Sequence, residues 1–319
     1  MEWFNDFWST YSTLVFSVGV HAMLALSIWL TLSCGLLSLA NAAFMGIGAY
    51  VSALLTLNLG WSFPAVLLAG GVAPAAVALL IGAPVLRLSG VYLAMATLAF
   101  GEVVRITVLN LEITGGPEGL NGIPLATEGW HIALILAVTV YGLARLRRSK
   151  VGRAFEAIKE DEVAARLMGI NVDRYKLLAF SLGAFIAGVA GALNAHFTFF
   201  ISPREYGFEN AVDILTMAVL GGVSNLIGPV LGASRQAAAV LEGVSLDLDD
   251  AVAPAQTSAP AAAPAAATPA PAEQKPAEQP EPAEPETDKE RALAKALDAK
   301  LKLATSFVSL GAVDEALEL

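Results

Sequence analysis

Two ionisable residues, Glu102 and Arg105, lie inside the apolar stretch LAMATLAFGEVVRITVLN. On a helix, positions i and i+3 share one face, so the carboxylate and the guanidinium can neutralise each other. Ionisable groups within a membrane span are costly and usually face the bundle interior or a water-filled path. The pair is therefore a candidate lining of a substrate pathway. The alternative is a structural pair near the outer interface, with Arg105 reaching towards water.

Residue types that carry catalysis or bind metals are sparse in the rest of the chain. The three histidines are far apart and flanked by apolar residues, and the single cysteine, Cys34, has no partner for a disulfide. The chain contains no G-x-x-x-x-G-K-[ST] phosphate loop and no plausible Ser/His/Asp or paired-carboxylate arrangement. We therefore expect no enzymatic activity, no metal or other cofactor in this chain, and no nucleic-acid partner.

Composition divides the chain into two unlike parts. Of its 319 residues, 56% are hydrophobic and only 15% are charged, whereas a soluble domain carries about 25% charged residues. Residues 1–233 have a net charge of −2, and residues 234–319 have a net charge of −8. Nine of the 16 prolines also lie between Pro254 and Pro285. We predict a membrane domain at 1–233, an acidic, disordered Ala/Pro/Glu linker at 234–288, and a short helical segment at 289–319.

The membrane domain contains seven stretches that are candidates to cross a bilayer, for which about 20 apolar residues are needed. They cover residues 14–37, 42–59, 63–86, 89–110, 130–146, 177–200 and 211–233. The sequence thus predicts an all-α, polytopic transmembrane helical bundle. Glycine and proline within 42–59 and 211–233 leave open whether these two stretches cross fully or are broken or re-entrant. The small residues of 181–193 favour close helix packing within the bundle.

The distribution of Lys and Arg predicts the orientation. Residues 145–176 carry nine of them, the interval 111–129 carries none, and 201–210 carries only Arg204. By the positive-inside rule, 145–176 is cytoplasmic and the other two intervals face outward. The tail is then cytoplasmic as well, provided that 211–233 crosses the membrane.

The cytoplasmic interval 151–176 has the pattern of a short amphipathic helix. Glu162 and Arg166 form an i,i+4 pair of favourable polarity, and Glu156 and Lys159 can form a second pair. An apolar stripe recurs at Val163, Leu167 and Ile170. Helix–groove recognition uses such a stripe, whereas a simple connector does not need one.

The surroundings of this stripe support the same interpretation. Ala164 and Ala165 keep the adjacent surface thin, and Gly169 suits the C-terminus of a helix. Asp173 can cap the next helix, which re-enters the membrane. We therefore expect the helix to insert into a groove of another protein.

Residues 160–170 resemble the cytoplasmic coupling motif of ABC importer permeases: an acidic residue, two alanines, three free positions and a glycine. Ala164, Ala165 and Gly169 match its spacing, and Glu162 lies one place further upstream than the consensus. More widely, residues 14–233 resemble the branched-chain amino-acid ABC importer permease family. The stretches that carry the resemblance are LSLANAAFMGIGAY, GVYLAMATLAFGEVVR, TGGPEGLNGIP, GRAFEAIKEDEVAARLMGINVDRYKLLAF and LGGVSNLIGPVLGA.

The resemblance implies a multi-pass subunit of the bacterial inner membrane that imports Leu, Ile, Val or a related substrate. It also implies three kinds of partner: a second, homologous permease, two ATPase subunits that bind ATP, and a periplasmic substrate-binding protein. The residues that would dock into the ATPase are Glu162, Ala164, Ala165, Gly169 and Ile170. The outward loop with Gly115, Gly116, Pro117 and Gly119 would face the binding protein.

The resemblance ends after Ala233, where the family continues with apolar helix. Residues 289–319 resemble one incomplete tetratricopeptide-type unit of cell-pole and pilus-assembly hub proteins, and one such unit cannot bury its own apolar face. We expect a marginal amphipathic helix here, and either a fusion or a truncated permease whose transport competence is in question. Two other functional classes stay open. One is a membrane-anchored scaffold whose tail recruits partners, and the other is an ion-driven secondary transporter.

Overall fold

The structure of the chain is a computed structural model. It describes residues 2–125, 127, 129–222 and 226–235, with side chains from Phe16 onward. All of them belong to one compact unit, Met1–Pro254. The predicted linker and C-terminal helical segment lie outside the described residues, apart from positions 234 and 235.

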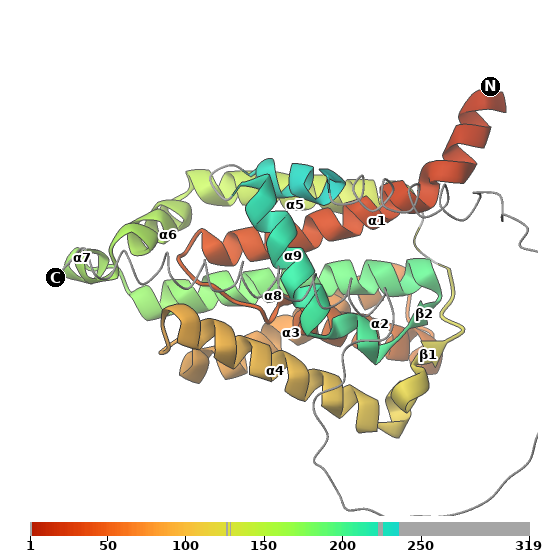
Figure 1. Cartoon of the computed structure of the whole chain (residues 1–319), viewed down its shortest axis with the longest axis horizontal. Helices are drawn as coiled ribbons and strands as arrows, with labels where there is room; N and C mark the ends of the chain where they lie inside the picture. Colours follow the sequence, from red (N-terminus) through yellow and green to blue (C-terminus); the bar gives the residue numbers. More distant parts are fainter. Residues whose placement is uncertain (1, 126, 128, 223–225, 236–319) are drawn as a thin grey trace, which may run out of the picture. The chain divides into compact units, whose positions relative to one another are not determined.

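The described residues form an almost entirely helical bundle (Figure 1). Its helices are α1 (Glu2–Leu32), α2 (Asn41–Leu59), α3 (Phe63–Val85), α4 (Gly90–Asn110), α5 (Gly129–Arg148), α6 (Lys150–Glu160), α7 (Glu162–Leu167), α8 (Val172–Thr198) and α9 (Phe208–Gly221). The connections contain three 3-10 turns, η1 (Glu112–Thr114), η2 (Gly116–Glu118) and η3 (Pro203–Tyr206), and two short strands, β1 (Leu120–Asn121) and β2 (Phe200–Ile201). Five helices, namely α2, α3, α4, α5 and α8, are long and apolar enough to cross a membrane. The predicted all-α, polytopic bundle is confirmed.

Helix α8 is the centre of the bundle and contacts α1, α2 and α3. Its glycines allow neighbouring backbones to come unusually close. A Cβ atom on Gly188 would collide with the Gly70 carbonyl and the Pro74 ring, and one on Gly48 would collide with the Gly188 backbone. The small residues of 181–193 therefore pack within the bundle, as predicted.

The first predicted span, 14–37, ends earlier than expected. Helix α1 ends at Leu32, and the chain runs without helix to Ala40, yet Leu36, Ser38 and Ala40 are buried. The Leu39 N–H donates to Thr97 Oγ1 at 3.0 Å. Because protein surrounds this stretch and side chains take up its backbone groups, non-helical backbone is tolerated inside the bundle.

The last predicted span, 211–233, is not one crossing helix. Helix α9 ends at Gly221, and a second helical stretch covers 228–235. The two pack closely, because Cβ atoms on Gly228 and Gly232 would collide with the backbones of Gly221 and Met217. The broken alternative is therefore the observed one. The tail is expected to be cytoplasmic only if 211–233 crosses the membrane. Because 211–233 is not one crossing helix, the structure does not support that expectation.

Candidate functional site

The predicted amphipathic helix is divided into two helices, α6 and α7. Asp161 separates them in an extended conformation, with φ −153°. Its Oδ1 atom accepts hydrogen bonds from the N–H groups of Val163 at 2.8 Å and Ala164 at 2.9 Å. Asp161 thus satisfies two of the N–H groups that a helix start leaves free, and it fixes where α7 begins.

Gly169 ends α7, as the sequence predicts. It has φ +82°, a left-handed conformation that glycine adopts without strain. The Gly169 N–H donates to the Arg166 carbonyl at 3.0 Å, and the Ile170 N–H donates to the Ala165 carbonyl at 3.1 Å. These two bonds form the Schellman motif, which closes the carbonyl end of the helix.

The prediction that Asp173 caps the following helix, α8, is wrong. Asn171, and not Asp173, is the N-cap of α8, because its side chain accepts from the Arg174 N–H at 3.2 Å. Asp173 lies in the first turn of α8, where its carboxylate accepts from Arg166 Nη2 at 3.2 Å. Asp173 therefore joins two helices instead of capping one.

Glu162 connects the short helix α7 to the centre of the bundle. Its Oε1 atom accepts from Arg166 Nη2 at 2.8 Å, which confirms the predicted pair. Its Oε2 atom accepts from Lys176 Nζ at 2.5 Å, and the Lys176 side chain is only 9% exposed. Sequence spacing does not indicate this second bond, because the two residues are 14 positions apart. Burial raises the pKa of Glu162, but the hydrogen bonds and charges of Lys176 and Arg166 outweigh it and hold the pKa below its ordinary value.

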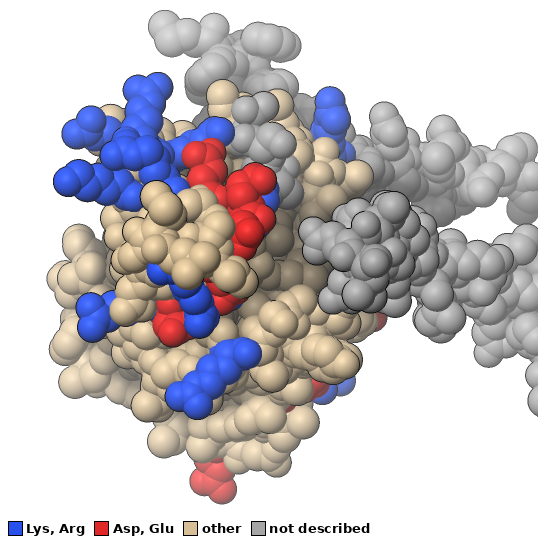
Figure 2. Space-filling view, turned by 90° about the vertical axis from the view of Figure 1, so that its left-hand side faces the viewer, with Lys and Arg blue, Asp and Glu red and all other residues tan. Residues whose placement is uncertain are grey.

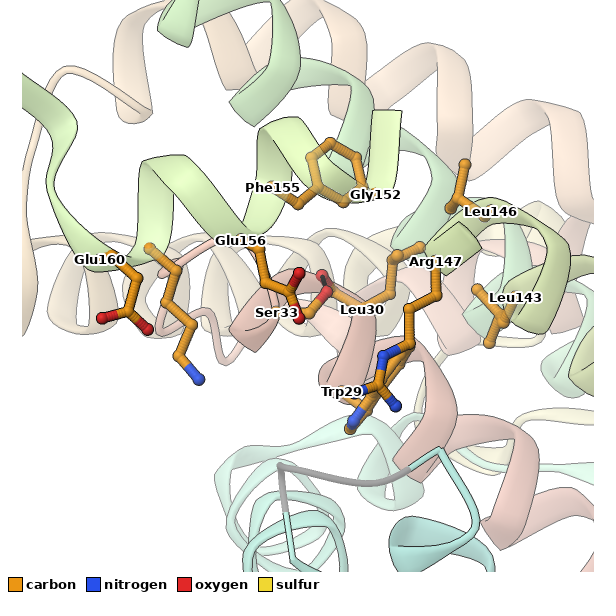
Figure 3. A pocket seen from close by; sticks show the side chains of 11 residues that line it. Trp29, Leu30, Ser33, Leu143, Leu146, Arg147, Gly152, Phe155, Glu156 and Glu160 are labelled. Carbon is orange, nitrogen blue, oxygen red and sulfur yellow. Dashed lines mark hydrogen bonds between the residues drawn. The ribbon is translucent and has the colours of Figure 1, made fainter. Parts of the chain in front are cut away.

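The second predicted pair on this segment is not formed. Within the described residues, no ion pair joins Glu156 to Lys159. Both residues line a pocket of about 260 Å³ between the ends of α1 and α5 and the helix α6. Figure 3 shows Glu156 of α6 and Arg147 of α5 beside this space, which Trp29 of α1 also lines.

The residues of α7 and of the turn after it fall into a buried group and an exposed group. Ala165 is buried, and Ile170 packs against the core. Val163, Leu167 and Met168 are 68%, 83% and 84% exposed, and Ala164 is exposed as well. The predicted stripe of Val163, Leu167 and Ile170 is thus split, because its first two members face outward and its third faces the bundle.

Charged side chains surround this exposed apolar group. Figure 2 looks at this end of the molecule, where basic side chains gather on one side and acidic side chains lie beside them. The basic residues of the interval are Arg145, Arg147, Arg148, Lys150, Arg153, Lys159, Arg166, Arg174 and Lys176. A small apolar surface with a charged border is the usual character of a protein interface.

Glu102 and Arg105 lie far along the chain from this segment, on α4. Arg105 Nε donates to Glu102 Oε2 at 2.8 Å, so the predicted pair is formed. Both side chains are about one-third exposed, and Glu102 also lines a small pocket with Tyr206 and Gly207. The pair is therefore partly exposed on α4, and it lies beside the η3 turn.

The loop with Gly115, Gly116, Pro117 and Gly119 is held by backbone contacts. The two 3-10 turns η1 and η2 form it, and β1 then pairs with β2 in antiparallel register, with Leu120 opposite Ile201. A Cβ atom on Gly119 would collide with the Ile201 carbonyl. Loop and strand pair therefore form one fixed surface at the end of the bundle opposite α7 (Figure 1).

The three histidines do not come together. His21 bonds to Ser17, His196 Nε2 lies 2.9 Å from Thr56 Oγ1, and the ring of His131 stacks on Trp130. Among the described residues, no group of three or more His, Cys, Asp or Glu is arranged to hold a metal ion. Cys34 is buried and free.

The comparison with known proteins gives one family and several relatives. The family described as the branched-chain amino acid transport system / permease component matches residues 10–235. The LivM permease proteins of a high-affinity branched-chain amino acid transport system, from Salmonella typhimurium and from Escherichia coli, are each 37% identical over 255 residues. That alignment covers 69% of this chain and 58% of each relative, so the chain spans little more than half of their length.

A second permease type is also similar. The LivH protein of Salmonella typhimurium is 41% identical over 105 residues, which cover 32% of each of the two chains. No solved structure matches.

Proposed function

The chain belongs to the branched-chain amino acid transport permease family, and we propose that it acts as one permease subunit of an ABC importer for such amino acids. It is a multi-pass membrane protein of a transport family, and that family is not one of enzymes. ATP would be bound by two separate ATPase subunits. A second, homologous permease would complete the membrane part, since both LivM and LivH proteins are similar to this chain.

The observation that carries this proposal is the geometry of α7. Three exposed apolar residues lie on a helix with fixed ends: Val163 and Leu167 belong to α7, and Met168 is its C-cap. A soluble partner with an apolar groove could bury these side chains, and each fully buried side chain of this size contributes about 1.5–3 kcal/mol. We assign the ATPase-docking role to α7 and its end, with Glu162, Ala164, Ala165, Gly169 and Ile170 as positioning residues and the exposed apolar trio as the contact.

Movement of the docked ATPases would reach the membrane through one connection. The ion pairs of Glu162 with Lys176 and of Arg166 with Asp173 tie α7 to the first turns of α8. Since α8 packs against α1, α2 and α3, a displacement of α7 would be passed to the centre of the bundle. The bundle would then change between inward-open and outward-open states.

Orientation follows from the same assignment. We place the interval 145–176 in the cytoplasm of a bacterial cell and the chain in its inner membrane, because the basic residues gather at this end (Figure 2). The loop around Gly115, Gly116, Pro117 and Gly119 would then face the periplasm. Its fixed backbone makes it a suitable surface for a substrate-binding protein.

Introducing a negative charge on the exposed face of α7 tests the proposal. We expect Leu167→Asp to abolish ATP-driven uptake of leucine by the assembled importer, because a carboxylate cannot be desolvated in an apolar groove. Leu167 is 83% exposed, so the folding of the chain should not change. Leu88→Asp is a matched control, since Leu88 is also exposed but lies in the turn between α3 and α4.

Two results would contradict the proposal. One is normal uptake by the Leu167→Asp variant, which would remove the docking role of α7. The other is ion-driven uptake without any ATPase, which would identify a secondary transporter. Co-purification of an ATPase with the wild-type chain, and its loss in Leu167→Asp but not in Leu88→Asp, would support docking directly.

A further inference from the structure

A second group of polar side chains surrounds the η3 turn. Tyr206 belongs to η3, and Tyr50 lies on α2; their rings meet edge to face with centroids 6.0 Å apart. Both residues are 3% exposed. Among the described residues, their hydroxyl groups are the buried side-chain atoms without a hydrogen-bond partner.

Packing alone does not explain these two hydroxyl groups. Phenylalanine would fill the same space with the same ring and would leave no polar atom unsatisfied. A buried polar atom without a partner is unusual in a folded protein and points to a group that the structure does not contain, such as a water molecule or a ligand.

Charged groups converge on the same turn. Glu205 precedes Tyr206 in η3; its side chain is exposed, and partial desolvation raises the pKa of its carboxyl group. On the other side, a Cβ atom on Gly207 would lie 3.4 Å from Arg105 Cδ, so the Glu102–Arg105 pair borders the turn. The turn also contacts both α2 and α4. Acidic, basic and hydroxyl groups therefore meet around η3 in an otherwise apolar bundle.

Two helices begin beside this group. Helix α9 starts directly after η3 with Gly207 as its N-cap, and α2 starts with Ala40 as its N-cap; in neither does a side chain cap the helix. Ala42 of α2 and Phe208 of α9 line the same small pocket as Tyr206 and Glu102. Helix N-termini carry partial positive charge and free N–H groups, which favour an anionic group nearby.

We propose that the η3 turn, together with Tyr50, forms a binding site for the zwitterionic head group of an α-amino acid. The proposal rests on the proposed function and specifies the chemistry by which its substrate is recognised. The hydroxyl groups of Tyr50 and Tyr206 donate to the carboxylate of the ligand, and Glu205 accepts from its ammonium group. The apolar side chain of the ligand lies against Leu39 and Leu98, which line the pocket. The pocket is small and is lined by Tyr206 but not by Tyr50 or Glu205, so the proposal requires η3 to move away from α2 when the ligand binds.

Thermal unfolding of the purified full-length chain, titrated with L-leucine, tests the site. We expect L-leucine to raise the unfolding temperature of the wild type. In Tyr50→Phe and Tyr206→Phe, the leucine concentration for half of this effect should rise about tenfold, because one hydrogen bond to a charged group is lost. Tyr141→Phe is the matched control, since Tyr141 is 68% exposed on α5. 3-Methylbutylamine lacks the carboxylate and 4-methylpentanoic acid lacks the ammonium group, so neither should replace leucine.

Three results would overturn the proposal. The first is a wild type that does not respond to leucine, and the second is an equal response of the wild type and both tyrosine variants. The third is a lower unfolding temperature in both variants with an unchanged leucine response, which would identify a structural water site. ATP-driven uptake distinguishes failure of the binding-site proposal from failure of the proposed function. Normal uptake by both tyrosine variants would contradict the binding site but would be consistent with the importer function. A leucine response of the chain without uptake by the assembled complex would support the binding site and contradict the importer function.

Discussion

This apolar bundle contains two polar clusters, one around Glu162 and one around η3, and they differ in whether their polar groups have hydrogen-bond partners. Around Glu162, each oxygen of the carboxylate accepts from a cation, Lys176 or Arg166. Around η3, the hydroxyl groups of Tyr50 and Tyr206 have no hydrogen-bond partner within the part of the chain that the structure describes. The first cluster is complete within the chain, whereas the second is incomplete without an added group.

This difference separates two mechanical roles. A fully paired network fixes the geometry between two helices, which suits the transmission of a displacement. An unsatisfied pair of hydroxyl groups lowers the stability of the fold and can be compensated by a ligand. We therefore expect substitutions around Glu162 to destabilise the chain, and isosteric removal of the hydroxyl groups at η3 to leave its stability unchanged or raised.

The largest effect should follow from Glu162→Ala. It leaves the Lys176 ammonium group, whose side chain is 9% exposed, without its carboxylate. Removal of one partner of a fully buried pair costs about 3–5 kcal/mol, and the 36% exposure of Glu162 reduces our expectation to about 2 kcal/mol. Denaturant unfolding of the chain in mixed micelles measures the change.

The double variant Glu162→Ala/Lys176→Met is the control for that prediction. It removes the unpaired charge together with its partner, so most of the lost stability should return. Additive losses in the double variant would mean that the two residues do not act as a pair.

A smaller loss should follow from Gly169→Ala. At φ +82° a residue with a Cβ atom is strained, and the left-handed conformation costs roughly 1 kcal/mol. No atom lies within 4 Å of the added Cβ, so steric collision does not contribute. Gly169→Asn should lose less, because asparagine tolerates this conformation better than alanine. The free energy of unfolding of the three proteins gives the order, and equal values for Ala and Asn would show that backbone strain is not the cause.

The sequence predicts the paired cluster far better than the unpaired one. Glu162–Arg166 and the end of α7 at Gly169 follow from local spacing along one helix, which residue types determine directly. The bond of Glu162 to Lys176 depends on the angle between α7 and α8, which the turn from Met168 to Asn171 sets and which spacing along one helix does not specify. Tyr50 and Tyr206 are 156 positions apart, and only the return of η3 into the bundle brings them together.

The same limit applies to helix ends within the bundle. Hydropathy places 14–37 and 211–233 as continuous spans, because it counts apolar residues and not hydrogen bonds. The breaks after Leu32 and Gly221 depend on partners elsewhere, such as Thr97 for the Leu39 N–H. Glycines in 42–59 and 211–233 point to special packing, and for 211–233 the broken alternative is the one observed.

A change of pH should weaken the paired cluster by a modest amount. The pKa of Glu162 is lower in the folded chain than its ordinary value of 4.5. The ionised carboxylate therefore stabilises the fold fully above that value, and this contribution is lost as the pH falls through the lower pKa of the folded state. The stability difference between the wild type and Glu162→Gln should stay constant from pH 8 to about 5 and shrink below pH ~4.5. A difference that instead grows on acidification would mean that Glu162 binds its proton more readily in the folded chain.

The smallest effect, and the one of opposite sign, should come from Tyr206→Phe without ligand. The ring stays in place against Gly46, and the hydroxyl group without a partner is removed. We expect the free energy of unfolding to stay the same or to rise by up to about 1 kcal/mol, since an unsatisfied buried hydroxyl costs about 1–3 kcal/mol and part of that is recovered by relaxation. A rise in Tyr206→Phe beside a fall in Glu162→Ala, measured under one condition, would establish the contrast between the clusters. A fall in both would show that the hydroxyl group already has a partner, and the two clusters would then follow the same rule.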